Sequence, residues 1–157
     1  MGTLKRLWIV LLFVTGCSIS HKDYDIRSYG AIPDSTTLNT KAIQDAIDAA
    51  AEAGGGTVVV PEGVYTTGVL HLKSNVELHL DSGATLLGTD NRLAYGRHDA
   101  SALIVAEGQR HIAITGQGVI DGQAGKLLKN LDSLLRAGII SDDEWQTYNA
   151  GHQKRPA

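Results

Sequence analysis

The sequence predicts an all-β fold, a solenoid of short parallel strands that follows one helix. From Thr57 onward, apolar segments of strand length are separated by Gly, Asn, Asp or Ser. The gaps are too short for the crossover helix that a flat parallel sheet needs, which favours a solenoid of stacked coils. An antiparallel sandwich is the structural alternative. The segments are TVVVP, GVLHL, NVELHL, ATLLG, ALIVA, HIAIT and GVIDG.

Two of these segments show the alternation expected of strands with one buried face. In NVELHL, the apolar side chains Val76, Leu78 and Leu80 alternate with Glu77 and His79. In HIAIT, two isoleucines at 112 and 114 flank an alanine in the same way. The stretches NVELHLDSGATLLG and HIAITGQGVIDG also share an order of strand, glycine turn, strand and closing glycine, which is typical of solenoid repeats.

A helix is predicted from Thr40 to Ala53. Its apolar residues recur at intervals of three and four and form one stripe, and its alanines favour helix. Asn39 or Thr40 can cap its start, and Gly54 is expected to end it in a left-handed conformation. The stripe consists of Ile43, Ala46, Ile47 and Ala50.

The N-terminus has the features of a bacterial secretion signal. Two basic residues precede an apolar run from Leu7 to Val14, which is too short to span a bilayer. Val14-Thr15-Gly16-Cys17 resembles a lipobox, which implies lipidation at Cys17 and a membrane anchor there. Ser18 after the cysteine favours the outer membrane. An ordinary signal peptide with an incidental cysteine is the alternative.

Composition limits the kinds of partner. The 157 residues suffice for one domain, and the formal net charge of −3 without a basic block argues against a nucleic-acid partner. The six histidines show no His-x-x-x-His spacing and no pairing with a cysteine, so we predict no metal site and no cofactor.

From YDIRSYGA to about Gln123, the chain resembles the N-terminal part of glycoside hydrolase family 28, the polygalacturonases and rhamnogalacturonases. The segments GVLHLKSNVELHLDSGATLLG and ITGQGVIDGQ carry this resemblance most specifically. It implies a right-handed parallel β-helix, with the helix Thr40 to Ala53 as the cap of its N-terminal end. It also implies a pectic polysaccharide as the substrate, hydrolysed with inversion by aspartates.

The family carries its catalytic groups in four motifs, Asn-Thr-Asp, Asp-Asp, Gly-His-Gly and Arg-Ile-Lys, and this chain contains none of them in place. Thr89-Asp90-Asn91 has the wrong order, and Asp142-Asp143 lies in a helix-capping box formed by Ser141 and Glu144. Gly151-His152-Gln153 and Arg155-Pro156 match only in part. We therefore assign no catalytic residue and no substrate-binding residue. Asp121 is predicted to stabilise a corner of the solenoid.

We expect four segments in the chain. They are a lipoprotein signal peptide (residues 1–16), a linker with YDIRSYGA as first strand (17–33), the capping helix with the first coils (34–123), and a helical insertion (124–157). The insertion should begin with an amphipathic helix that Gly138 ends. The apolar residues of that helix are Leu127, Leu128, Leu131, Leu134 and Leu135.

Three functions remain open at this point. The first is the N-terminal fragment of a surface-anchored pectin-degrading glycosidase, inactive alone because its catalytic coils are absent. The second is a non-catalytic, lipid-anchored β-helix that serves as a binding or interaction module. The third, a lyase or tailspike-like relative that shares only the solenoid, is disfavoured by the two family-specific segments. The chain stops where the next coil should begin, and we therefore expect it to end in mid-fold.

Overall fold

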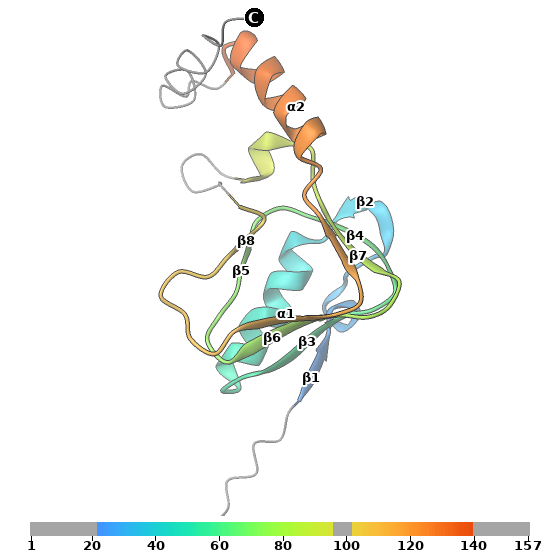
Figure 1. Cartoon of the computed structure of the whole chain (residues 1–157), viewed down its shortest axis with the longest axis vertical. Coiled ribbons are helices and arrows are strands. Elements are labelled where there is room, and N and C mark those ends of the chain that lie inside the picture. The colour runs from blue at the N-terminus through green and yellow to red at the C-terminus, as the bar shows by residue number, and fades with distance from the viewer. Residues whose placement is uncertain (1–21, 96–101, 140–157) are drawn as a thin grey trace, which may run out of the picture.

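The computed structural model describes residues 22–95 and 102–139 (Figure 1). Their strands form three sheets in which every neighbouring pair is parallel. The first sheet holds β1 (Asp23–Asp25), β3 (Gly56–Val60), β6 (Val76–Leu80) and β9 (Ala113–Gly116). The second holds β2 (Asp34–Leu38), β4 (Gly63–Thr67), β7 (Ala84–Gly88) and β10 (Val119–Asp121). The third holds β5 (Leu70–His71) and β8 (Ile104–Val105).

This arrangement is a parallel β-helix, as the sequence predicted. The chain passes through the sheets in turn, so that successive coils stack, and each inward side chain lies over its equivalent in the coil before. Val58 pairs with Leu78, and Leu78 pairs with Ile114 in the first sheet. In the second sheet, Leu86 lies between Tyr65 and Ile120. The predicted alternation in β6 is confirmed, because its apolar residues are buried and Glu77 and His79 point outward.

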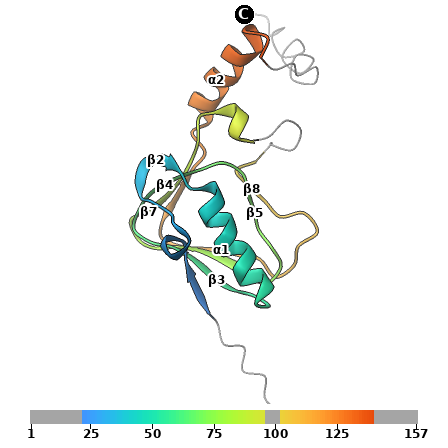
Figure 2. The same cartoon turned by 180° about the vertical axis from the view of Figure 1, so that it is seen from behind.

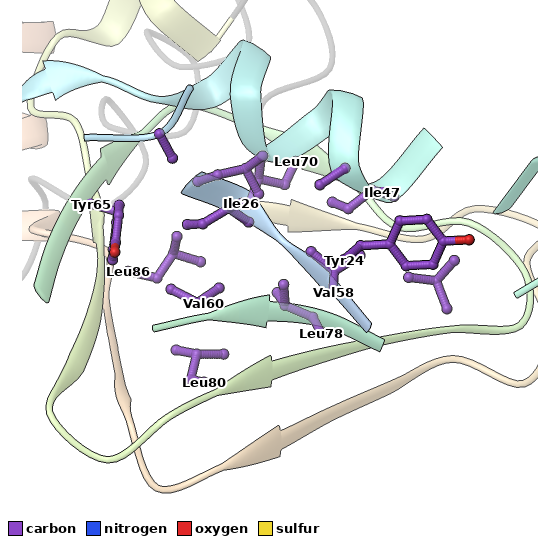
Figure 3. Close-up of a cluster of buried hydrophobic side chains, with 14 of the residues drawn as sticks. Tyr24, Ile26, Ile47, Val58, Val60, Tyr65, Leu70, Leu78, Leu80 and Leu86 are labelled. Atoms are coloured by element: carbon purple, nitrogen blue, oxygen red, sulfur yellow. The ribbon is translucent and has the colours of Figure 1, made fainter. Parts of the chain in front are cut away.

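The core fills the space inside the coils and under one helix. Figure 3 shows its side chains between that helix and the strands. All of the labelled residues are at most 5% exposed. They are Tyr24, Ile26, Ile47, Val58, Val60, Tyr65, Leu70, Leu78, Leu80 and Leu86.

The helix α1 (Thr40–Glu52) closes one end of the solenoid, opposite the last coil, as Figures 1 and 2 show from the two sides. Its predicted stripe is confirmed: the four residues are fully buried. Gly54, with φ of +94°, ends the helix, and its neighbour Gly55 donates to the carbonyl of Ala50 at 2.9 Å. A solenoid end covered in this way exposes no apolar interior.

The start of α1 differs from the expected side-chain cap. Asn39 occupies the N-cap position, but its side chain makes no capping bond. It accepts a hydrogen bond from the Ile32 amide at 2.7 Å and donates to the carbonyls of Ile32 and Thr37. The Thr40 hydroxyl accepts from the Gly68 amide at 2.6 Å. Both side chains therefore join the helix start to neighbouring loops instead of satisfying its own amides.

The prediction of YDIRSYGA as a strand was wrong over most of its length. Only Tyr24 and Asp25 belong to β1, and a 3-10 helix, η1 (Ile26–Tyr29), follows. Asp25 caps η1 by accepting from the Arg27 amide at 2.8 Å, and Gly30 ends it in the left-handed region. This turn carries the fully buried Ile26 into the core.

Two further strands were not predicted from the sequence, and two others are shorter than predicted. β2 and β4 were not predicted, because DSTTL and GVYTT contain more polar than aliphatic residues. GVLHL and ALIVA contribute only two residues each, as β5 and β8. Their third sheet is correspondingly small.

A second helix, α2 (Ala124–Arg136), extends away from the solenoid (Figure 1). Gly138 ends it as predicted, with φ of +68°. It packs on a 3-10 helix, η2 (Arg92–Tyr95), where Asn130 accepts a hydrogen bond from the Arg92 amide at 2.9 Å. Leu131 is buried there. The capping box predicted at Ser141 and Glu144 lies outside the described residues.

The corner between β9 and β10 depends on a glycine. Gly116 has φ of +100°, and a Cβ on it would clash with the backbone of Leu80. The same Leu80 carbonyl accepts from the amides of Gln117 and Gly118 at 3.0 and 3.2 Å.

We expect Gly116→Ala to lower the free energy of unfolding by about 3 kcal/mol, measured by urea denaturation. The control is Gly125→Ala, since that glycine in α2 has open space around it and should tolerate alanine. Equal destabilisation by both changes would contradict this account.

The turn inside β2 gives a pH-dependent prediction. Hydrogen bonds from the Thr37 amide and hydroxyl and the Thr36 amide lower the pKa of Asp34 from 3.8 to about 2. The stabilisation from this carboxylate is therefore complete above pH 3.8 and is lost as the pH falls toward 2. An NMR titration should find the Asp34 midpoint near 2, and Thr37→Val should raise it more than Thr36→Val does. An Asp34 midpoint near 3.8 in the unchanged protein would show that the turn does not form in solution.

Candidate functional site

The main cluster of polar side chains on the solenoid lies on the outer face of the first sheet, across β6 and β9. It consists of Glu77, His79, Asp81 and Thr115, and we call it the β6–β9 cluster. Alternation in β6 points Glu77 and His79 away from the core, and parallel pairing brings Thr115 beside His79.

A shared hydroxyl holds the β6–β9 cluster together. Thr115 donates to the Glu77 carboxylate at 2.5 Å, and its oxygen lies 2.7 Å from His79 Nδ1. His79 Nε2 lies 3.6 Å from a carboxylate oxygen of Asp81, and His79 Nδ1 lies 3.8 Å from Glu77. The cluster therefore joins two successive coils through side chains as well as through the backbone ladder.

The surroundings of the β6–β9 cluster favour a structural role for these side chains over a role in acid catalysis. A glycosidase acid depends on a buried, apolar environment that keeps its carboxyl protonated. Glu77 and Asp81 instead have exposed side-chain fractions of 29% and 46%. What the cluster does is bridge β6 to β9.

A second charged group lies near one end of the same sheet. The Arg27 guanidinium binds both carboxylate oxygens of Asp25, with its closest contact at 2.6 Å, and this lowers the pKa of Asp25 and raises the pKa of Arg27. Asp81 adds a weaker attraction that also raises the pKa of Arg27. Burial raises the pKa of the nearby Tyr65 hydroxyl, because the ionised phenol would lose its hydration. The Asp25–Arg27 pair links the end of β1 to the η1 turn.

Asp121 takes the structural role that was predicted for it. It ends β10, and its carboxylate accepts a hydrogen bond from the Gln123 amide at 2.8 Å. Gln123 has φ of +46° and donates from its side chain to the Gly88 carbonyl. Asp121 thus stabilises the turn that leads out of the last coil.

The out-of-order motif Thr89-Asp90-Asn91 also forms a turn. The Thr89 hydroxyl accepts from the Asn91 amide at 3.2 Å, and the Asn91 side chain accepts from the Leu93 amide at 3.0 Å. These bonds begin η2. Cys17, Asp142-Asp143, Gly151-His152-Gln153 and Arg155-Pro156 lie outside the described residues.

The described residues, 22–95 and 102–139, contain neither a metal-binding cluster nor a membrane-spanning helix. In this part of the chain, no three His, Cys, Asp or Glu side chains converge as a metal site would require. Over the same residues, neither helix combines the length and the apolar character needed to cross a bilayer.

Sequence reasoning did not identify the β6–β9 cluster, although the repeat contained the signal for it. Aligning NVELHL with HIAIT places Thr115 at the position of His79, and this is the register that the structure has. What the alignment could not give is the side-chain geometry, in which one hydroxyl contacts both Glu77 and His79.

Comparisons with known proteins agree with this architecture. Residues 24–150 match the family model described as rhamnogalacturonase A/epimerase, pectate lyase-like. An exo-poly-alpha-D-galacturonosidase of Dickeya chrysanthemi is 42% identical over 123 residues, which are 67% of this chain and 20% of that protein.

Two solved structures share the fold. A provisionally assigned glycosyl hydrolase of Parabacteroides merdae superposes with a TM-score of 0.73 at 36% identity, covering 77% of this chain and 53% of that one. A family 28 exopolygalacturonase of Yersinia enterocolitica gives 0.60 at 40% identity, covering 65% and 21%. The chain therefore spans about a fifth to a half of the length of these relatives. The match over most of its residues shows that the chain belongs to the rhamnogalacturonase A/epimerase, pectate lyase-like family, and the predicted relationship to glycoside hydrolase family 28 is confirmed.

Proposed function

We propose that this chain is the capped N-terminal part of a pectin-degrading glycosidase of the polygalacturonase type, and that it is inactive alone. The observation that carries the proposal is the 42% identity, over two thirds of the chain, to a protein named for exo-cleavage of polygalacturonate. The fold adds support: α1 closes one end of the solenoid, and β9 and β10 present the edges on which further coils could stack.

The proposed inactivity follows from the chemistry that residues 1–157 contain. Inverting hydrolysis needs one carboxylic acid and one carboxylate, held about 6.5–9.5 Å apart to admit a water molecule. The family's aspartate motifs are not among these residues, and Asp121 holds a turn. The role of residues 22–123 would then be to begin the β-helix on which catalytic coils stack.

A chimera tests this role. We expect residues 22–123 to replace the matching N-terminal part of the Dickeya chrysanthemi enzyme with retention of exo-cleavage, measured as galacturonate released from polygalacturonate. The chain alone, at the same concentration, should release none. A control chimera with Gly116→Arg should lose activity, because the clash with Leu80 disrupts the last coil.

Each part of the proposal can fail separately. Galacturonate release by the chain alone would show that the inactivity is wrong. An inactive chimera that is folded by circular dichroism would count against the role as the first part of the enzyme. Tight binding of pectin by the chain alone would then favour the second candidate, a non-catalytic binding module. The observation that supports this candidate is the absence of the family's aspartate motifs from residues 1–157.

We also propose that the protein is a lipoprotein anchored at Cys17, in the outer membrane. The support is the lipobox-like Val14-Thr15-Gly16-Cys17 after a short apolar run, with Ser18 next. Cells fed a labelled fatty acid should incorporate the label into the unchanged protein and not into Cys17→Ala. The control Ser18→Ala should keep the label. Equal labelling of Cys17→Ala would exclude this residue as the site of attachment.

A further inference from the structure

Helix α2 carries a charge opposite to that of the described residues before it. Residues 22–95 and 102–123 contain six Lys or Arg and twelve Asp or Glu side chains, which gives a formal charge of −6. The helix Ala124–Arg136 contains three Lys or Arg and one Asp, which gives +2. A net positive charge is therefore carried by the helix that projects from an acidic solenoid (Figure 1).

The cations of α2 lie along one side of the helix. Lys129 follows Lys126 by three residues, and Arg136 follows Lys129 by seven, so the three side chains are aligned on an α-helix. They span about 15 Å, because each helical residue adds about 1.5 Å along the axis. We call Lys126, Lys129 and Arg136 the basic stripe.

The basic stripe points away from the body of the protein. All three of its side chains are exposed. Leu131 lies two residues from Lys129 and five from Arg136, which places it on the opposite side of the helix, and it is only 6% exposed. The apolar side of α2 is therefore turned toward η2, and the basic side is turned toward solvent.

The local partners of the stripe leave most of its charge available to a ligand. Lys126 donates to the side-chain oxygen of Gln123 at 2.7 Å, and this neutral partner leaves the ammonium charge in place. Arg136 Nε lies 2.8 Å from a carboxylate oxygen of Asp132, but these side chains are 78% and 60% exposed. Such an exposed pair contributes little and can open to another anion.

We propose that the basic stripe binds an anionic polysaccharide whose sugars carry carboxylates, of the galacturonate type. The inference rests on the function proposed above. Each galacturonate carries one carboxylate, so a chain that lies along α2 offers successive anions to successive cations. The acidic solenoid repels the same polymer, and the field of the protein therefore directs it to α2.

An anionic membrane fits α2 less well than a polysaccharide does. A helix that binds at a membrane surface buries its apolar side among the lipids. In α2 this side already packs on η2, where Leu131 is buried and Asn130 accepts from the Arg92 amide. The side that remains for a ligand is polar, and a hydrated polymer of carboxylates needs only the cations.

Frontal affinity chromatography on immobilised polygalacturonate tests the proposal on the chain from Ser18 onward, which contains every described residue and no lipid. We expect weak, reversible retention that is lost near 1 M salt, where the Debye length is about 3 Å. Lys126→Gln/Lys129→Gln should raise the Kd about tenfold and leave the circular dichroism unchanged, because both side chains are exposed. Fully methyl-esterified pectin, which has the same backbone without the charges, should not retain the chain.

Lys41→Gln/Lys73→Gln is the matched control. It removes the same amount of charge from two exposed lysines that pair with Asp45 and Asp48 on the solenoid, so the Kd should stay unchanged. An equal loss of affinity in both double variants would overturn the proposal, since the net charge alone would then decide binding. Equal retention by methyl-esterified pectin would also overturn it. So would binding to phosphatidylglycerol vesicles without retention on polygalacturonate, which would indicate a membrane instead.

This result is independent of the chimera experiment, because the chimera receives residues 22–123 and therefore lacks α2. An active chimera together with a chain that polygalacturonate does not retain would overturn the basic stripe alone. An inactive, folded chimera together with stripe-dependent retention would count against the role in the enzyme and support the stripe.

Discussion

The parallel ladder between β3 and β6 is the constraint on which the other parts of the fold depend. Five consecutive residue pairs fix the register of these strands, from Gly56 with Val76 to Val60 with Leu80. A shift of one residue would turn the buried Val58 and Leu78 outward and bring polar side chains into the core. The same register determines where β9 stacks on β6. It also places the Leu80 carbonyl where the amides of the corner after β9 donate to it, and it determines which buried side chains lie under α1.

The acidic side chains in the described part of the chain serve the fold, as their hydrogen bonds and ion pairs show. Each acidic residue that drew attention in the described part of the chain has a structural partner. Asp25 binds Arg27, Asp34 accepts from Thr37, and Asp121 accepts from Gln123. Glu77 and His79 share the hydroxyl of Thr115 and join two coils. These carboxylates stabilise turns and coil contacts.

Much of this fold could be predicted because its main signals are local. The stripe of α1, the left-handed Gly54, the alternation in β6 and the stop at Gly138 follow from the spacing of apolar residues and glycines. β2 and β4 could not be predicted, because their polar residues become strands only when neighbouring coils supply hydrogen bonds. The η1 turn was missed because one side chain, Asp25, decides it. The contacts of the β6–β9 cluster join residues 36 and 38 positions apart, and they depend on side-chain geometry that spacing does not specify.

The position of α1 also has a consequence for how the protein is made. The helix and the first strands that it covers are the first parts of the solenoid to be synthesised. Domains generally fold from the N-terminus as the chain is made. Here each finished coil presents in-register edges to the coil that arrives next: Val76 in β6 pairs with Gly56 in β3, and Ala113 in β9 pairs with Glu77 in β6. The fold can therefore assemble from the N-terminus onward, one coil at a time. Each new coil stacks on earlier coils whose other end α1 already covers, so it does not depend on distant parts of the chain.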